Sequence, residues 1–420
     1  MTDVQEDKKT GARPRLILLT QWFDPEPTFK GLLFAHALQE RGYDVEVVTG
    51  FPNYPGGKVY SGHRVRPIKR ENIDGVAITR LALYPSHDNR TLPRVANYVS
   101  FFLSALLYLT FVARRADILY AYHPPLTVGL AAALAKVFRR TPSVLDIQDM
   151  WPDTLAATGM VSTSWPLRIV GLVCCWVYAR MTHIVVLSPG FKRLLIERGV
   201  APDKVTMIYN WADEAAIVAA GANRPASMPA DGRFRILYAG NMGLAQNLDV
   251  VIDSAHFVAA KSDRTDLCFL GDGLEAERIK KRVKTENLAN VHFFPKVSMG
   301  EVGSYLAAAD CLLVSLRPDP LFEITIPSKT QAYMSAGRPI IIAVTGDAAS
   351  LVEMAGAGIA VPPGDAKALA NAVLSMAALP DNKHAAMAKS ARDYYNSSLS
   401  LQCGVDAFDL LFSAIRRNGS

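Results

Sequence analysis

Residues Arg317–Ile342 read RPDPLFEITIPSKTQAYMSAGRPIII, a loop followed by a short helix and a buried strand. Pro327 cannot continue a preceding helix, and Ser328 directly after it is a preferred N-cap residue. Gly337 ends the helix before the β-branched run of residues 340–342, which predicts a strand. A helix that leads straight into a buried strand is typical of alternating α/β domains.

Three polar side chains surround the start of this helix: Glu323, Lys329 and Gln331. The free N–H groups and the positive dipole end of a helix attract an anion, and Lys329 adds a full charge there. A phosphate fits this position, and Glu323 can accept hydrogen bonds from hydroxyls attached to that phosphate. Together the three side chains indicate a nucleotide-sugar.

A structural alternative exists for the same residues. Ser328 to Gln331 also fits the capping-box pattern S-x-x-Q, in which the glutamine bonds the N–H of the cap and no ligand. Lys329 and Glu323 also fit a solvated ion pair that contributes little.

Length and composition indicate a globular protein of two domains. The chain has 420 residues, half of them hydrophobic, with 28 Gly and 25 Pro. The N-terminus MTDVQEDKKT is polar, so we expect no secretory signal and a cytoplasmic location. Five cysteines without ligand spacing are expected as buried thiols in a reducing compartment. They are Cys174, Cys175, Cys268, Cys311 and Cys403.

The positive charge lies in the first half of the chain. Residues 1–210 hold 25 basic and 17 acidic side chains, whereas residues 211–420 hold 20 and 22. The basic residues alternate with apolar helices and not with nucleic-acid motifs, so we expect no nucleic-acid partner. An anionic membrane surface is the expected partner, and a solvated basic face is the alternative.

Val95–Ala113 is a run of 19 uncharged residues between Arg94 and Arg114. Its length is close to that of a transmembrane helix. Strands are predicted on both sides of it and must join one sheet, which a single crossing would split. A helix lying in the membrane interface or buried in the core is therefore expected, and the basic flanks favour the interface.

Short apolar strands alternate with helical patterns along the whole chain, which predicts two doubly wound α/β halves. We expect a first domain at residues 1–212 and a second at residues 213–399, connected through residues 212–233. A final apolar helix at about residues 400–420 is expected to return to the first domain.

Unusual residues follow the predicted strands, where ligands bind in open α/β sheets. His123 follows one strand, and Asp149 and Trp151 follow the next. In the second half, the Gly240–Gly243 turn suits a diphosphate but is equally explained by turn geometry, and Gly271–Gly273 is more simply a turn. Asp149 fits an orienting role in its loop as well as a contact with substrate.

Several chemistries are disfavoured by missing motifs. The chain holds no G-x-G-x-x-G and no Walker sequence, which argues against dinucleotide redox chemistry and ATP hydrolysis. It also holds no D-x-D pair, the usual metal site for a nucleotide diphosphate. We therefore expect neither a metal nor a cofactor.

Five stretches carry a resemblance to a known family. QWFDPEPTFKG (21–31), VVTGFPNYPGGKVY (47–60), HPPLTVG (123–129), DIQDMWPD (146–153) and PSKTQAYMSAGRPI (327–340) resemble the retaining GT-B glycosyltransferases of family four over nearly the whole chain. They look most like bacterial O-antigen and capsule enzymes described as N-acetyl-L-fucosaminyl (L-fucosamine) transferases. The resemblance implies the GT-B fold, in which two Rossmann-like domains face each other across a cleft.

The resemblance also assigns roles to residues. The family's Glu-x7-Glu motif appears here as Glu323 and Gln331, so its second member departs from the pattern. The cations common in the family's phosphate loop are missing, which leaves Lys329, backbone amides and Arg317 to neutralise the diphosphate. His123, Glu323 and Lys329 are the predicted catalytic residues, and Asp149 and Trp151 the predicted acceptor side. The predicted donor-binding residues are Gly31, Gly240, Asn241, Gly243, Arg317, Glu323, Ile326, Pro327, Ser328, Lys329 and Gln331.

By resemblance, the reaction moves a sugar from a UDP-sugar to a polyprenyl-diphosphate-linked saccharide, with retention of configuration and without a metal. Such an acceptor implies a peripheral position on the inner face of the cytoplasmic membrane. The alternatives are a sugar-nucleotide epimerase of the same fold and an inactive membrane-associated scaffold.

Overall fold

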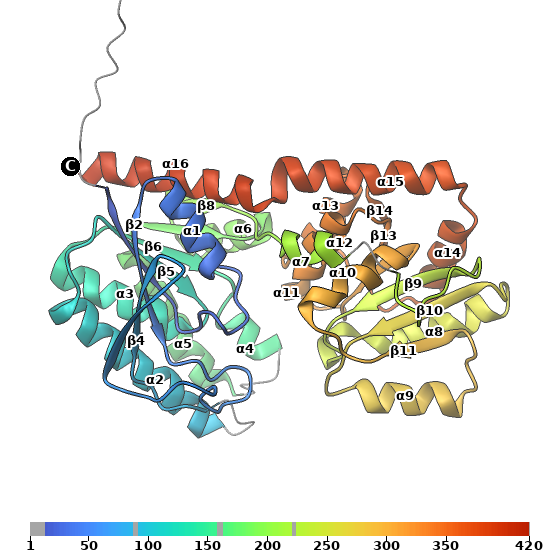
Figure 1. The fold of residues 1–420 in the computed structure, drawn as a ribbon, viewed down its shortest axis with the longest axis horizontal. Helices are drawn as coiled ribbons and strands as arrows, with labels where there is room; N and C mark the ends of the chain where they lie inside the picture. Colours follow the sequence, from blue (N-terminus) through green and yellow to red (C-terminus); the bar gives the residue numbers. More distant parts are fainter. Residues whose placement is uncertain (1–12, 87–90, 158–162, 221–223, 420) are drawn as a thin grey trace, which may run out of the picture.

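The computed structural model describes residues 13–86, 91–157, 163–220 and 224–419. Two α/β domains lie side by side, and helices α15 and α16, in red, run along one side of both (Figure 1). The predicted pair of doubly wound domains is confirmed.

The first domain is built on an eight-stranded sheet with the order β3-β4-β2-β1-β5-β6-β7-β8. All neighbours are parallel except β3, which pairs antiparallel with β4 at one edge. The strands are β1 Arg15–Leu19, β2 Asp44–Gly50, β3 Ile68–Ile73, β4 Val76–Leu81, β5 Ile118–His123, β6 Ser143–Ile147, β7 His183–Val186 and β8 Val205–Met207.

The second domain is built on a six-stranded parallel sheet with the order β11-β10-β9-β12-β13-β14. Its strands are β9 Phe234–Ala239, β10 Thr265–Leu270, β11 Val291–Phe294, β12 Cys311–Ser315, β13 Ile340–Ala343 and β14 Gly358–Val361. Every strand predicted from the apolar runs is present.

Helices cover both sheets. The first domain has α1 Leu32–Glu40, α2 Thr91–Leu107, α3 Leu126–Arg139, α4 Asp153–Ala157, α5 Ser164–Arg180 and α6 Pro189–Glu197. The second has α7 Glu214–Ala220, α8 Leu248–Ala259, α9 Ala276–Thr285, α10 Met299–Ala308, α11 Pro320–Glu323, α12 Ser328–Ala336, α13 Asp347–Met354, α14 Ala366–Ala377 and α15 Asp381–Tyr394. After a π-helical turn at Tyr395–Leu399, the chain continues into α16 Leu401–Gly419.

The final helix contacts the first domain. Phe408 and Phe412 of α16 lie in one buried cluster with Phe34 of α1 and Tyr120 of β5. The phenol of Tyr43 also donates a hydrogen bond of 2.8 Å to Asp409. Helix α16 therefore packs into the core of the first domain.

Each sheet has one place where the strand order reverses, and ligands bind at such switch points in open α/β sheets. In the first sheet it lies between β1 and β5, and in the second between β9 and β12. His123 ends β5, whereas the Gly240–Gly243 turn follows β9 and Arg317 follows β12. The fold thus brings the predicted residues to the two positions where a ligand is expected.

Strand β3 was not predicted. Its residues IKRENI are exposed and half-buried in alternation, and three of them are charged. An edge strand with one solvated face lacks the apolar run that marks the buried parallel strands.

The uncharged helix forms α2 and continues as a π-helical turn, Tyr108–Val112. Leu92–Val112 and Asp381–Arg417 are both long and apolar enough to cross a membrane, and 33% and 39% of their most apolar windows are buried. Phe101 and Leu109 reach the core of the first domain, whereas Leu103 and Phe111 are exposed. One face of this helical segment therefore packs on the first domain, and the other is exposed.

The prediction of five buried cysteines was wrong in part. Cys174, Cys268 and Cys311 are buried, but Cys175 is exposed and Cys403 is half-buried. Cys175 lies on the outer side of α5, where the apolar sequence faces solvent and not the sheet.

Candidate active site

Helix α12 begins one residue earlier than predicted. Pro327 is its N-cap, with φ of −62° and ψ of 139°, and Ser328 is the first helical residue. The predicted Ser328 cap is therefore wrong, because the proline already supplies the extended conformation that an N-cap needs. The capping-box alternative for Gln331 is wrong as well. Gln331 is 2% exposed, and its Oε1 has no hydrogen-bond partner among the described residues.

Lys329 lies against the loop that follows β9. Its Nζ is 2.5 Å from the hydroxyl of Tyr238 and 4.1 Å from the centre of that ring. A Cβ on Gly240, whose φ is +131°, would lie 2.7 Å from Cε of Lys329. Gly240 is therefore needed for the close approach of the lysine and not for a turn alone.

The amine of Lys329 has no carboxylate beside it among the ion pairs of the described residues. Burial lowers the pKa of Lys329 to about 7, because the charged form loses its solvation. The ion pair of Lys329 with Glu323, which was the structural alternative, is not among the ion pairs of the described residues. The Glu323 side chain is exposed at the end of α11. A buried amine without a counter-ion gains its charge when an anion arrives.

In the turn after β9, the N–H group that was predicted to bind a diphosphate already has a partner within the protein. The Gly243 N–H, expected to serve a diphosphate, donates to Oε1 of Gln246 at 3.0 Å, and the Tyr238 hydroxyl donates to the carbonyl of Asn241 at 2.5 Å. A Cβ on Gly271 would lie 2.2 Å from the Gly240 carbonyl, so this glycine is needed for packing between the two loops.

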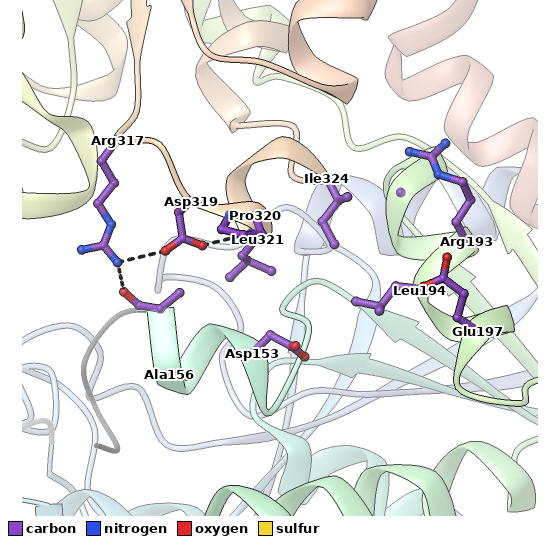
Figure 2. Close-up of a pocket in the computed structure, with 12 residues that line it drawn as sticks. Asp153, Ala156, Arg193, Leu194, Glu197, Arg317, Asp319, Pro320, Leu321 and Ile324 are labelled. Carbon is purple, nitrogen blue, oxygen red and sulfur yellow. Dashed lines mark hydrogen bonds and ion pairs between the residues drawn. The ribbon is translucent and has the colours of Figure 1, made fainter. Parts of the chain in front are cut away.

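Arg317 bridges the two domains. Its guanidinium donates to the carbonyl of Ala157 at the end of α4 and, at 3.3 Å, to Asp319 (Figure 2). It lines a cavity of about 560 Å³ between the domains, together with Asp153, Arg193 and Ile324. Of the predicted site residues only Arg317 lines this cavity, so it adjoins the predicted site without containing it.

Contacts around Ile324 hold the segment before α12 against the first domain. Ser188 Oγ donates to the carbonyl of Ile324 at 2.5 Å, and the Gly190 N–H donates to Oδ2 of Asp347 at 2.5 Å. A Cβ on Gly190 would lie 2.4 Å from Ile324. Sequence reasoning missed Asp347, whose partner lies 157 residues away along the chain.

His123 is buried at the end of β5. Its ring is 2% exposed, its Nδ1 has no partner among the described residues, and the ring centre lies 6.0 Å from that of Trp151. Burial lowers the pKa of His123 to about 3, so the imidazole is neutral at physiological pH. A neutral imidazole can hold a sugar hydroxyl by hydrogen bonding without adding charge.

Asp149 lies two residues from Trp151 and is strongly desolvated. Burial raises the pKa of Asp149 to about 6. Its charge acts on the phenols of Tyr54 and Tyr98, whose rings flank Trp22 at 4.7 Å and 6.5 Å. Sequence reasoning missed these three aromatic residues, although Tyr54 stands in the quoted stretch FPNYPGG.

Gly31 and Lys30 precede α1. A Cβ on Gly31 would lie 2.3 Å from Oδ2 of Asp24, which accepts a hydrogen bond of 2.7 Å from the Leu32 N–H. Lys30 is 1% exposed and donates to Asn210 at 3.1 Å. Crowding by Asp24 explains the glycine, while a diphosphate contact at Gly31 stays a prediction.

Two further predicted residues, Ile326 and Pro327, directly precede α12. Ile326 is buried, and Pro327 is half-buried. The described residues contain no group of three or more His, Cys, Asp or Glu side chains that could hold a metal ion.

The structure assembles two clusters of predicted residues. Lys329 lies with Gly240 in the second domain, and His123 lies with Asp149 and Trp151 in the first.

Comparison with protein families gives two matches. Residues 32–211 match the family described as glycosyl transferase 4-like domain, and residues 233–378 match glycosyl transferases group 1. The two matches correspond to the two sheets.

Two curated relatives are 26% identical to the chain. A protein described as a glycosyltransferase, WbjE of Pseudomonas aeruginosa, aligns over 69% of this chain and 73% of its own. A protein described as a colanic acid biosynthesis glycosyl transferase, WcaI of Escherichia coli K12, aligns over 86% of this chain and 90% of its own.

Solved structures share the fold. Sucrose-phosphate synthase of Thermosynechococcus elongatus superposes with a TM-score of 0.71 at 16% identity, covering 97% of this chain and 100% of that one. Anabaena HepE in complex with UDP-glucose gives 0.66 at 16% identity, covering 95% and 99%. The two family matches together span most of the chain, one on each domain, so the chain is a glycosyltransferase of the GT-B fold, with a glycosyl transferase 4-like domain followed by a group 1 domain.

Proposed function

We propose that this protein transfers N-acetyl-L-fucosamine or a related N-acetylated sugar from a UDP-sugar to a polyprenyl-diphosphate-linked saccharide, with retention of configuration. The process would be O-antigen, capsule or exopolysaccharide assembly. The observation that carries the proposal is the desolvated amine of Lys329 at the switch point of the second sheet. It lies next to Gly240 and has no carboxylate beside it among the ion pairs of the described residues. Its sugar and linkage rest on the resemblance alone.

The donor side follows from charge. A nucleoside diphosphate leaves readily once its developing charge is neutralised, so the enzyme needs electrostatic stabilisation more than an acid. Lys329 and the first N–H groups of α12 would supply it. Glu323, exposed at the end of α11, would bind hydroxyls of the donor sugar. HepE holds UDP-glucose on a similar fold, which supports a uridine nucleotide here.

The acceptor side would lie in the first domain. Aromatic faces suit the apolar faces of sugar rings, and Trp22, Tyr54 and Tyr98 lie together beside Asp149. The carboxylate of Asp149 would accept a hydrogen bond from the attacking hydroxyl and orient it. A donor phosphate oxygen would then take the proton, as the retaining mechanism implies.

A membrane location is supported by an apolar face on the first domain. Helix α3 packs between α2 and α5, and the outer sides of all three carry exposed apolar residues. This apolar face consists of Leu92, Val95, Val99, Leu103, Leu107, Phe111, Val112, Val137, Phe138, Trp165, Ile169 and Leu172. Contiguous exposed apolar surface is uncommon in soluble monomers, so contact with a bilayer is the use we infer.

A transfer assay tests the proposal. The purified protein is incubated with labelled UDP-sugars, including UDP-N-acetyl-L-fucosamine, and a polyprenyl-diphosphate-saccharide extracted from membranes. Label transferred to the lipid fraction is expected. Isomerised free nucleotide-sugar would instead indicate an epimerase, and no reaction with any donor would indicate a scaffold.

Variants then test the site. Glu323→Ala is expected to lower the transfer rate strongly while leaving the melting temperature unchanged, because this side chain is exposed. Glu277→Ala, on the exposed face of α9 in the same domain, serves as a control that should transfer at the native rate. If Glu323→Ala also transfers at the native rate, the assignment of the donor sugar site is wrong.

A further inference from the structure

A second cavity, away from both switch points, is lined by four arginines. It has a volume of about 520 Å³ and lies where the end of α16, the end of α3 and the start of β5 meet. Its lining residues include Arg115, Arg140, Arg416 and Arg417. The four side chains come from three separate parts of the chain, so only the fold brings them together.

The charge of this cavity is not balanced. Asp117 is its one acidic lining residue, and Oδ2 of Asp117 already accepts a hydrogen bond of 2.7 Å from the Arg15 N–H. Arg115, Arg140 and Arg417 form no ion pair among the described residues. Like charges gathered in a concavity repel each other, and an anion that enters relieves the repulsion.

An apolar rim lies beside the arginines. Phe111 is 77% exposed and Phe138 is 66% exposed, and Val112 and Val137 next to them are exposed as well. Arg139 joins the two segments by donating to the carbonyls of Thr110 and Ala113, at 3.1 Å and 2.8 Å. These four apolar residues belong to the apolar face, so the basic cavity opens at the edge of that face.

We propose that this cavity binds the phosphate of an anionic phospholipid headgroup, while the apolar rim enters the boundary between headgroups and acyl chains. The proposal rests on the membrane location argued above. A free phosphate would use the arginines alone, whereas a lipid uses the arginines and the rim together. Planar guanidinium groups suit phosphate because they donate two parallel hydrogen bonds.

The site would also fix how the enzyme lies on the bilayer. An apolar face alone lets a protein tilt over several contacts with the bilayer. A headgroup held by Arg416 and Arg417 fixes one end of α16, and α15 continues this helical row over the second domain (Figure 1). The headgroup site and the apolar face would therefore set the height of the cleft above the lipid.

Vesicle sedimentation of the full chain tests the proposal. The variant Arg115→Gln/Arg417→Gln removes two exposed charges from the cavity. The control Lys281→Gln/Lys284→Gln removes two exposed charges from α9 in the second domain. On vesicles of phosphatidylcholine with phosphatidylglycerol, we expect roughly tenfold weaker binding of the arginine variant, and native binding of the control. On phosphatidylcholine alone, the wild type and the arginine variant should bind equally weakly.

Further measurements keep the outcomes separate. Phe111→Ser/Phe138→Ser should weaken binding to both vesicle types, because it removes the apolar rim. Equal losses for the arginine and lysine variants would overturn the proposal, since they would indicate attraction by net charge alone. Thermal stabilisation by inorganic phosphate that the arginine variant loses, without a change in vesicle binding, would overturn it in favour of a free anion.

The proposed function can fail independently. The arginine variant should transfer sugar at the native rate to a short-chain acceptor in detergent, where no bilayer is needed. Absence of transfer by the wild type in that assay would count against the proposed function and leave the vesicle result intact.

Discussion

Lys30 and Lys329 each lie beside an aromatic ring, one in each domain, yet their surroundings differ. Lys30 is buried, whereas Lys329 is half-buried. Lys30 Nζ lies 3.5 Å from the centre of the Trp211 ring and donates to Asn210, and the charge of Asp146 acts on it. Burial lowers the pKa of Lys30 only to about 8, because Asp146 opposes the shift. Lys329 has the Tyr238 hydroxyl and no carboxylate, and its pKa falls to about 7.

The difference indicates that Lys30 is a structural cation, whereas Lys329 can pair with a bound anion. Asn210 donates to Gln148 at 2.5 Å, and Gln148 and Tyr120 both donate to Asp146. The groups that stabilise the charge of Lys30 therefore all belong to the protein. Among the described residues, Lys329 has a hydrogen bond to the Tyr238 hydroxyl but no such network. A buried charge is stable only when it is paired, so the partner of Lys329 has to come from outside.

The largest expected effect is the loss of transfer in Lys329→Met. Removal of one charge that stabilises the leaving group should lower the transfer rate roughly a thousandfold. The melting temperature should stay at or above the wild-type value, because a desolvated amine without a carboxylate is removed. Rate and melting temperature are measured on the same preparation. A large drop in melting temperature would show that Lys329 is structural like Lys30.

The same substitution at Lys30 should act on stability. Lys30→Met leaves the buried Asp146 without its cation, and unfolding by urea should show a loss of about 3 kcal/mol. The double variant Lys30→Met/Asp146→Asn should recover at least half of that loss. Equal stability of Lys30→Met and wild type would remove the contrast between the two lysines.

Asp149 extends the comparison to an acidic group. Its raised pKa means that the carboxylate is charged only above about pH 6, so the transfer rate should rise as pH passes through that value. Asp149→Asn should transfer about a hundredfold more slowly and lose this rise, with donor binding unchanged. The folded state holds the Asp149 proton more tightly than the unfolded state, so this contribution to stability is lost as the pH rises from about 4 to about 6 and is absent above that pH. The variant should therefore melt no lower than wild type at pH 8, and a pH profile like that of wild type would exclude the assigned role.

Gln331 should give the smallest effect. Gln331→Met removes a buried amide oxygen that has no partner, so stability should rise by about 1 kcal/mol while UDP binding weakens about fivefold. Thr330→Val is a matched control, since Oγ1 of the buried Thr330 is also without a partner. It should be stabilised without loss of UDP affinity. A loss of affinity in both variants would assign the effect to the packing of α12.

Most of the fold could be predicted from the sequence. Buried parallel strands are nearly continuous apolar runs, so β9, β12 and β13 stand out from the sequence. The edge strand β3 could not be found, because its side chains alternate and its pairing is antiparallel. The start of α12 was displaced by one residue, since the backbone of Pro327 and not the side chain of Ser328 forms the cap.

Site residues could be predicted from the sequence where a local pattern, such as a helix start, positions them. Contacts between distant segments could not be predicted. Lys329 beside Gly240 follows from a helix start and a turn, each visible in the sequence. The contact of Gly190 with Asp347 joins residues of different domains, and no local pattern records it. Arg317 was predicted to neutralise the diphosphate, but its guanidinium already donates to Ala157 of the other domain and to Asp319. The contact with Ala157 could not be predicted, because it joins distant segments.

Proton uptake on binding UDP measures whether Lys329 acquires its charge from the donor diphosphate. Roughly nine-tenths of the Lys329 side chains are neutral at pH 8 if their pKa is about 7. The second pKa of a phosphate is about 6, so UDP itself brings no proton at that pH. Calorimetric titration at pH 8 in two buffers of different ionisation enthalpy should give an uptake close to one proton per UDP. The uptake should fall to about half a proton near pH 7, where about half of the amines are already charged. Binding at pH 8 without proton uptake would contradict the claim that Lys329 acquires its charge from the donor diphosphate.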